Sequence, residues 1–143
     1  MKLVQHLLDK KGRQIFSVGP DDSVLEAIKI MAEKGIGSLV VLQDETLLGI
    51  LSERDYARKV IIKGRSSETT RVSEIMTEDV LTTSSGQTVN QCMNLMTEKK
   101  IRHLPVVEDG VVVGMISIGD LVEAIISDQQ EEIEQLEQYI SGH

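Results

Sequence analysis

Apolar residues along the chain recur at two spacings, one typical of helices and the other of strands. In residues 24–31 they fall at positions i, i+3, i+4 and i+7, and the same spacing returns in residues 89–96. This spacing predicts two helices that each bury one face. Short apolar runs follow each helix, and their length predicts strands. The runs cover residues 38–42, 47–51, 103–107 and 111–116.

The two halves of the chain are copies of one another. Residues 18–58 align with 83–123 at an offset of 65 without a gap, and eleven of the 41 positions are identical. An extended segment opens each copy, at Ile15–Val18 and at Val80–Thr83, so the predicted order is β-α-β-β-α, twice. A unit of about forty residues is too small to bury both faces of its sheet. We therefore expect an α/β (α+β) fold in which two repeats pack with pseudo-two-fold symmetry.

Polar and turn-forming residues mark the boundary between the copies. The connector Lys63–Thr70 reads K-G-R-S-S-E-T-T, as expected of a linker, and Val72–Met76 is expected to begin the second unit. The predicted domains are a first repeat at residues 1–65, a second repeat at 72–127 and an acidic helical tail at 128–143.

Composition and charge narrow the possible functions. The chain has 143 residues, a net charge of −8 and only 2% aromatic residues, so its core is expected to be aliphatic. No Lys or Arg follows Arg102, which argues against a nucleic-acid surface. The single cysteine, Cys92, excludes an internal disulfide and is expected to pack in the core. No apolar run suits a signal peptide or a membrane span, and no Cys and His spacing suits a metal, so we expect a cytoplasmic, metal-free protein.

The candidate chemistry lies where the second strand of each repeat's hairpin leads into a helix. The sequences are G-I-L-S-E-R-D at Gly49–Asp55 and G-M-I-S-I-G-D at Gly114–Asp120. The free amides at a helix N-terminus favour phosphate, the serine hydroxyl adds a contact, and the aspartate can accept two hydrogen bonds from the cis-diol of a ribose. The S-x-x-D spacing is also close to a capping box, so both residues can simply cap the helix. Capping boxes are likewise expected at Ser23–Glu26 and Thr88–Gln91.

These residues resemble the CBS-domain family, named for cystathionine β-synthase. The resemblance covers nearly all of residues 1–127 and is most specific at Ile101–Val107 (I-R-H-L-P-V-V) and Gly114–Asp120. A tandem pair of this kind is similar to a Bateman module. The resemblance implies a regulatory homodimer, not an enzyme, that binds an adenine nucleotide (AMP, ADP, ATP or NADH) or S-adenosylmethionine in clefts between the repeats.

The resemblance also implies roles for individual residues. The two aspartates would hold ribose hydroxyls, the two serines would lie near phosphate, the starts of the middle strands would border the adenosine, and the opening segments would touch the base. Apart from the resemblance, a nucleotide in an acidic protein needs cations nearby, and the candidates are Arg54, Arg102 and His103 if the repeats pack symmetrically. The alternative for Arg54 is a solvated surface arginine. The predicted ligand-binding residues are Ser17, Gly37, Ser38, Ser52, Arg54, Asp55, Thr82, Arg102, His103, Leu104, Pro105, Ser117 and Asp120.

The two predicted sites are not equivalent. Repeat one has Val40 where repeat two has Pro105, and it has Gly37 and Ser38 where repeat two has Arg102 and His103. The second site is therefore the closer match to the family. The first site is expected to be roomier and to bind a different ligand, a larger ligand or none. Three further cations of the first repeat are expected on a solvated helix face: Arg58, Lys59 and Lys63.

A long helix without Gly or Pro is predicted from Asp120 to Ile140. Its apolar residues form a short heptad seam, with an acidic outer face that would repel a parallel copy. The seam is expected to pack on the body of the protein or on an antiparallel second copy, and we favour self-association. The seam positions are Val122, Ile126, Gln129, Ile133, Leu136 and Ile140.

Three functions are compatible with these patterns. The first is a regulatory module that binds a nucleotide. The second is a dimeric scaffold without a ligand, in which Asp55 and Asp120 only cap helices. The third is an enzyme acting on a nucleotide, which would need a base beside the phosphate. His103 is the only candidate for that base, and no partner that would orient it is recognisable, so we expect no catalysis.

Overall fold

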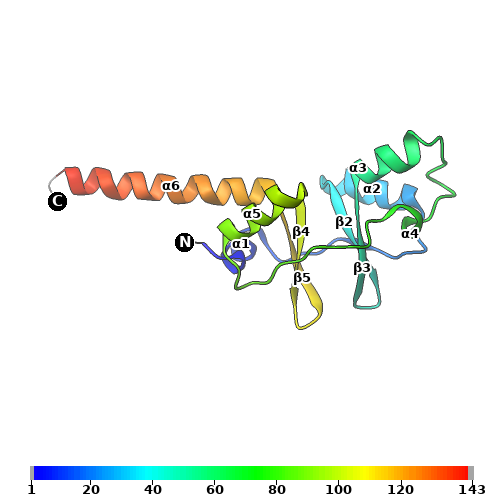
Figure 1. Cartoon of the computed structure of the whole chain (residues 1–143), viewed down its shortest axis with the longest axis horizontal. Helices are drawn as coiled ribbons and strands as arrows, with labels where there is room; N and C mark the ends of the chain where they lie inside the picture. Colours follow the sequence, from blue (N-terminus) through cyan, green and yellow to red (C-terminus); the bar gives the residue numbers. More distant parts are fainter. Residues whose placement is uncertain (1, 142–143) are drawn as a thin grey trace. The chain divides into compact units, whose positions relative to one another are not determined.

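The structure, a computed structural model, describes residues 2–141 and shows a mixed α/β fold with two small sheets and a long C-terminal helix (Figure 1). This confirms the fold class predicted from the duplication. The helices are α1 (Val4–Lys11), α2 (Val24–Lys34), α3 (Glu53–Tyr56), α4 (Val72–Ile75), α5 (Val89–Lys99) and α6 (Ile118–Ile140), with a π-helical stretch at Ala57–Ile61. The strands are β1 (Ser17–Val18), β2 (Ser38–Gln43), β3 (Thr46–Ser52), β4 (His103–Glu108) and β5 (Val111–Ser117).

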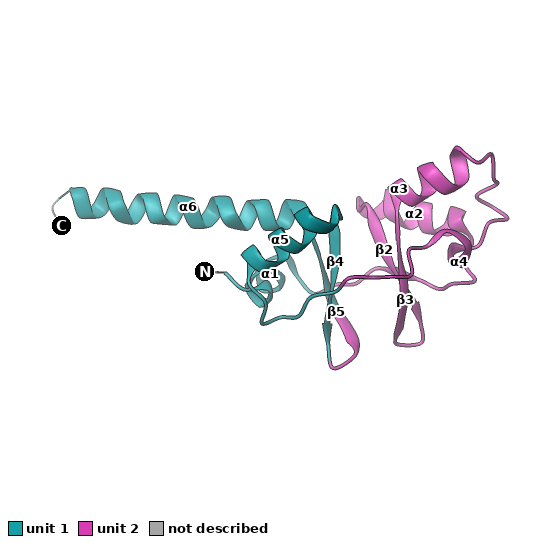
Figure 2. Cartoon of the chain, in the orientation of Figure 1, with its two compact units in different colours: residues 1–13, 82–108, 113–143 teal, residues 14–81, 109–112 magenta. Residues whose placement is uncertain are grey.

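The chain divides into two compact units, and each takes in the segment that precedes the other repeat (Figure 2). Unit 1 holds the described parts of residues 1–13, 82–108 and 113–143, and unit 2 holds residues 14–81 and 109–112. In unit 1 the amide of Val4 donates to the carbonyl of Gln87 at 2.9 Å, and in unit 2 the amide of Val72 donates to the carbonyl of Asp22 at the same distance.

Helix α4 is therefore part of the unit built on the first repeat. Val72–Met76 was predicted to begin the second repeat, and in the structure the backbone bond of Val72 and the burial of Val72 and Ile75 pack α4 within unit 2. The ranges 1–65 and 72–127 stay predictions of where the sequence repeats lie.

Unit 2 contains a three-stranded sheet in the order β1-β2-β3. Strand β1 runs parallel to β2, and β2 pairs antiparallel with β3, so that Ser38 lies opposite Ser52. The core beside this sheet is aliphatic, and the side chains of Leu39 and Leu51 are fully buried. The pairing brings the end of β3 next to the beginning of β2, which is where the first candidate site was predicted.

Unit 1 repeats this arrangement with a reduced first strand. Strands β4 and β5 form a two-stranded sheet, and Thr83 adds a single parallel bridge to Val106. The predicted extended segment Val80–Thr83 is thus shortened to one bridged residue, Thr83. Its amide donates to the carbonyl of Pro105, and its carbonyl accepts from the amide of Val107.

Two glycines that are identical in the repeats allow a leading segment to lie against each sheet. A Cβ atom at Gly114 would stand 2.6 Å from a methyl carbon of Leu8 in α1. A Cβ atom at Gly49 would stand 2.7 Å from the carbonyl oxygen of Thr77, just after α4. Both distances are too short for any side chain, so the glycines are required by this packing and not by turn geometry.

The predicted helix starts are confirmed, with one difference in their hydrogen bonds. Thr88 and Gln91 form a reciprocal capping box at the start of α5. Ser23 accepts from the amide of Glu26 at the start of α2, but within the described residues the Glu26 side chain returns no bond to Ser23. In the first repeat the last helix keeps α-helical geometry only over α3 and then becomes π-helical.

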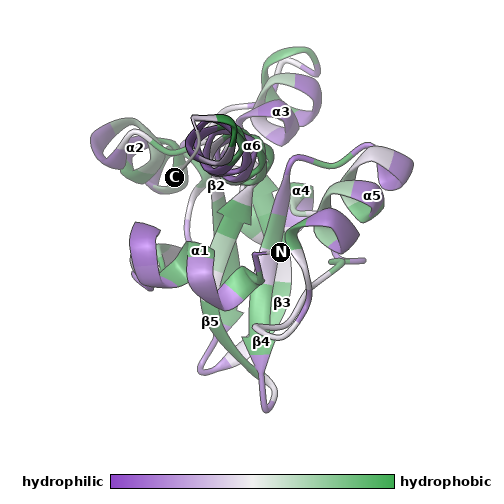
Figure 3. Ribbon diagram, turned by 90° about the vertical axis from the view of Figure 1, so that its left-hand side faces the viewer, coloured by the Kyte–Doolittle hydropathy of each residue, from purple (hydrophilic) through white to green (hydrophobic). Residues whose placement is uncertain are grey.

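Only the first turns of α6 are packed. Leu121 and Ala124 are buried, whereas residues 129–141 are exposed. The hydropathy colours in Figure 3 show apolar strands, while the helices carry both polar and apolar surface. The seam from Ile126 onward does not pack on the body of unit 1, contrary to one of the two expectations for it. Residues 142 and 143 of the predicted tail lie outside the described residues. Over residues 2–141, no helix combines the length and the apolar character needed to cross a bilayer.

Candidate functional site

The start of α6 is organised around a reciprocal pair of hydrogen bonds. The amide of Ser117 donates to Oδ2 of Asp120 at 2.8 Å, and the amide of Asp120 donates to the Ser117 hydroxyl at 3.2 Å. This is a complete capping box, so the structural role weighed for these two residues is real. The box also holds the carboxylate in one orientation at the helix N-terminus, where free amides and the helix dipole favour anions.

A lysine from a distant element completes this arrangement. Nζ of Lys11, at the end of α1, lies 2.6 Å from Oδ2 of Asp120 and 2.8 Å from the carbonyl oxygen of Met115. Burial by itself would raise the pKa of Asp120, but the bonds from Lys11 and from the Ser117 amide outweigh it, and the net shift is downward. Asp120 is therefore a carboxylate at neutral pH, with both of these hydrogen bonds on one oxygen.

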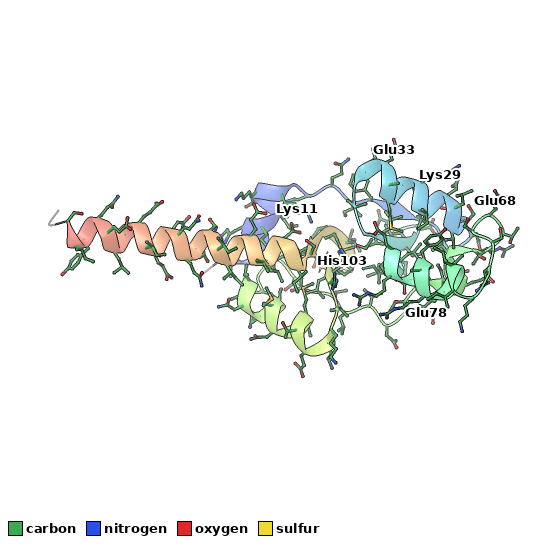
Figure 4. All side chains as sticks on the ribbon, turned by 90° about the horizontal axis from the view of Figure 1, so that it is seen from above. Lys11, Lys29, Glu33, Glu68, Glu78 and His103 are labelled. Carbon is green, nitrogen blue, oxygen red and sulfur yellow. The ribbon has the colours of Figure 1, made fainter. Side chains whose placement is uncertain are left out.

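His103 lies beside this ion pair in a neutral form. Burial lowers its pKa, and the positive charges of Lys11 and Arg102 lower it further, while Asp120 acts in the opposite direction. Figure 4 labels Lys11 and His103 near the beginning of α6. A neutral imidazole offers one donor and one acceptor and adds no charge next to Lys11. The net charge of the cluster therefore depends on Lys11, Arg102 and Asp120.

Backbone pairing brings two of the predicted segments of unit 1 together. The amide of Ile118 donates to the carbonyl of Arg102 at 2.9 Å, which places the start of β4 against the start of α6. Arg102 and Thr82 are exposed, and Pro105 is buried. The Leu104 side chain is fully buried in the core, so only the backbone of this residue can border a ligand.

Unit 2 has a matching junction with a different cation. The amide of Ser52 donates to Oδ2 of Asp55 at 2.9 Å, and the amide of Asp55 donates to the Ser52 hydroxyl at 3.2 Å. Nζ of Lys59, one turn further on, lies 3.2 Å from Oδ1 of Asp55 and donates to the carbonyl of Ile75 at 2.9 Å. Lys59 was expected on a solvated face, and the structure corrects this, because both contacts anchor its ammonium.

The remaining predicted residues of unit 2 surround this junction. The amide of Glu53 donates to the carbonyl of Gly37 at 3.0 Å, and Ser38 is buried opposite Ser52. Arg54 is exposed and makes no ion pair within the described residues. Ser17 is also exposed, on β1 beside β2. The structure therefore brings Gly37, Ser38, Ser52 and Asp55 together, whereas Arg54 points to solvent.

Comparison with known proteins places the chain in a family. Two stretches of it, residues 11–62 and 72–127, match the family model of the CBS domain. The chain belongs to the CBS-domain family. The resemblance inferred from the repeat motifs is thereby confirmed, and each match includes one of the two S-x-x-D junctions.

Named relatives agree with this assignment. The CBS domain-containing protein CBSX3, mitochondrial, of Arabidopsis thaliana is 44% identical over 127 residues, which are 85% of this chain and 62% of that protein. The chain thus spans less than two thirds of that relative's length. A solved CBS-domain protein from Burkholderia ambifaria is 50% identical and superposes with a TM-score of 0.86, over 90% of this chain and 96% of that one.

One solved CBS domain pair carries adenosine compounds. The pair from protein MJ0100, in complex with 5′-methylthioadenosine and S-adenosyl-L-methionine, is 25% identical. It superposes with a TM-score of 0.80 over 90% of this chain and 98% of that chain.

Lys11 is the residue of the cluster around Asp120 that sequence reasoning missed. It precedes the duplicated region, so it has no counterpart in the repeat alignment and belongs to no motif. Its local sequence shows only that it lies in the last turn of a helix. The helix dipole stabilises a lysine in that position, so the position does not point to a binding role. Only the packing of α1 on unit 1 brings it to Asp120.

Cys92 is a packing residue, as expected for this CBS repeat. It is 2% exposed, burial raises the pKa of its thiol, and its sulfur lies 3.3 Å from the Thr83 hydroxyl. Across residues 2–141, no cluster of His, Cys, Asp and Glu has an arrangement that suits a metal ion.

Proposed function

We propose that the chain is a regulatory CBS module that binds an adenine nucleotide, AMP, ADP, ATP or NADH, at the strand-to-helix junctions of its two units. The observation that carries the proposal is the cluster at the start of α6. A carboxylate held at a helix N-terminus, a lysine, an arginine and a neutral histidine meet there on elements far apart in the sequence. Such convergent polar groups are typical of a small-molecule site.

The oxygen atoms of Asp120 allow capping and ligand binding together. The Ser117 amide and Lys11 both bind Oδ2, so among the described contacts Oδ1 is left to accept from a ligand. A ribose diol supplies two hydroxyl donors for a carboxylate, and the phosphate of the same nucleotide suits the ammonium and guanidinium nearby. A surface pocket of about 300 Å³ opens between α1 and the first turns of α6, and Lys11 and Asp120 line it.

Unit 2 offers a second, different site in this proposal. Its aspartate is held by a lysine of its own helix, and Gly37 and Ser38 stand where unit 1 has Arg102 and His103. Unit 2 also has Arg54 where unit 1 has Gly119, so its positive charge lies elsewhere, and this site is expected to bind a different ligand, a larger one or none. A homodimer and a cytoplasmic location belong to the same proposal, and sedimentation and cell fractionation test them.

The competing function is a scaffold without a ligand, which the two capping boxes favour. Calorimetric titration of AMP, ADP, ATP and NADH separates the functions when Asp120→Asn is compared with the native chain. Asparagine keeps one carbonyl oxygen for the Ser117 amide and loses the charge and the second acceptor. We expect at least a tenfold loss of affinity, on the order of 2 kcal/mol.

Glu134→Gln is the matched control, because Glu134 is exposed on the same helix and does not line this pocket. It is expected to bind as tightly as the native chain. If none of the four nucleotides binds the native chain, the scaffold function replaces the sensor. If both variants bind a nucleotide equally well, the chain binds it elsewhere and the site at Asp120 is overturned.

A further inference from the structure

Helix α6 carries an apolar face that nothing in the described chain covers. The seam consists of Val122, Ile126, Gln129, Ile133, Leu136 and Ile140, which alternate in steps of four and three residues. Ile126 is 49% exposed, Leu136 60% and Ile140 79%. Exposed apolar residues at heptad spacing are typical of a helix that binds another helix. The seam continues past the part of α6 that packs in unit 1.

The beginning of α6 already shows what kind of helix fits beside it. Helix α1 lies near the first turns of α6 and buries the apolar residues Val4 and Leu8 in the same core cluster as Leu121. Lysines at both ends of the α1 segment contact acids of α6. Lys11 pairs with Asp120 at 2.6 Å, and Lys2 pairs with Asp128 at 3.5 Å and donates to the Ser127 hydroxyl at 3.3 Å. An amphipathic segment with flanking lysines thus covers one face of α6 up to Asp128, the face that carries Leu121 and Ala124. The seam lies on another face, and its first residues stay exposed beside α1, Val122 at 44%.

The charges beside the exposed seam favour the same kind of partner. The charged residues in the positions flanking it are Glu123, Glu132 and Glu137, and no Lys or Arg follows Arg102 in the chain. In a parallel pair of identical helices, Glu132 would face Glu137 of the other copy, and in an antiparallel pair acids would again face acids. Like charges in such positions are destabilising. A second copy of α6 is therefore a poor partner.

We propose that the seam from Ile126 to Ile140 binds an amphipathic helix of another protein, one whose apolar heptad face is flanked by Lys and Arg. The partner would lie on a different face of α6 from α1 and would use the same chemistry, apolar side chains flanked by lysines. Apolar side chains would cover the seam, and basic side chains would pair with Glu132 and Glu137. This inference does not depend on nucleotide binding.

The test uses the full chain and two designed helical peptides of three heptads. Both peptides carry Ile and Leu in the seam positions, and the flanking positions are Lys in one peptide and Glu in the other. Fluorescence anisotropy of the labelled peptides is expected to show at least tenfold tighter binding of the lysine peptide. The charge-reversed variant Glu132→Lys/Glu137→Lys is expected to reverse that preference.

Two further variants separate docking from simple attraction to an acidic protein. Ile133→Asp/Leu136→Asp adds two acids on the seam, and Gln135→Asp/Gln138→Asp adds two acids on exposed positions away from it. The seam variant is expected not to bind the lysine peptide, although this variant is more negatively charged than the native chain. The control variant, with the same added charge, is expected to bind the lysine peptide.

Equal binding by the two variants, or no binding of the lysine peptide, overturns the proposal. Sedimentation of the chain without peptide completes the test. A dimer that the seam variant abolishes and the control preserves would identify a second copy as the occupant and would also overturn it.

Discussion

Lys11 and Asp120 are 109 positions apart in the sequence, and Nζ of the lysine lies 2.6 Å from Oδ2 of the aspartate. The carboxylate also accepts from the Ser117 amide, so one atom joins a local helix cap to a contact from the other end of the chain. In unit 2 the equivalent carboxylate of Asp55 finds its cation, Lys59, on its own helix. The two CBS junctions therefore share a cap and differ in how their charge is balanced.

Replacement of Lys11 tests this ion pair through the pH dependence of stability. Asp120 has a lowered pKa in the folded state, so its contribution to stability is present above the unfolded pKa of about 3.9 and is lost as the pH falls through the folded value. The Lys11→Met variant is expected to lose up to about 1 kcal/mol of unfolding free energy at pH 7, because the lysine is partly exposed. Urea denaturation at pH 7 and pH 3 measures the difference, which should shrink at pH 3.

Lys10→Met is the control for this experiment. Lys10 borders the same pocket but forms no ion pair within residues 2–141. An equal and pH-independent effect in both variants would contradict a role for the Lys11–Asp120 pair in stability.

The pKa of His103 is expected to move in opposite directions in two variants. Lys11 lowers this pKa and Asp120 raises it. Lys11→Met should therefore raise the pKa of His103, and Asp120→Asn should lower it. Titration of the imidazole signals by NMR follows both. If neither variant moved the His103 titration, the histidine would not lie in the field of the ion pair.

Gly114→Ala is expected to destabilise the fold because its new methyl group would meet Leu8. The added carbon would stand 2.6 Å from a methyl of this fully buried leucine, and overpacking of this kind costs about 1–3 kcal/mol. In a Leu8→Ala background the glycine substitution should cost less, and a double-mutant cycle in urea measures the coupling.

Gly86→Ala is the matched substitution, since no heavy atom within 4 Å would meet its Cβ. It is expected to change stability by no more than about 0.5 kcal/mol. A coupling free energy of zero between the substitutions at Leu8 and Gly114 would show that the packing of α1 does not require glycine at position 114.

Cys92 is expected to react with thiol reagents only when the protein unfolds. Its thiol is buried and its pKa is raised by that burial, so both access and thiolate formation are suppressed in the native state. Alkylation at pH 8, followed by mass spectrometry, should be slow without urea and fast above the unfolding midpoint. Rapid labelling of the native chain would mean that unit 1 opens locally around α5.

Features that depend on neighbouring residues could be predicted from the sequence. The apolar spacings, the caps at Thr88 and Ser117 and the strand-to-helix junctions all appear where they were expected, because each is decided by residues within one or two turns. The duplication also indicated that the junctions would occur twice. The family assignment followed from the same local motifs.

Other features depended on contacts between distant segments. Lys11 reaches Asp120, α4 joins the first repeat and Gly114 accommodates Leu8 only because the leading segments pack beside elements far along the chain. No local sequence pattern predicts such a contact. A lysine at the end of a helix is already stabilised by the helix dipole, so its presence there does not imply a distant partner. The sequence by itself determined the elements and the two junctions. Tertiary packing decided which cation each aspartate holds, and it left the seam of α6 exposed, because α1 packs on the face of α6 that carries Leu121 and Ala124.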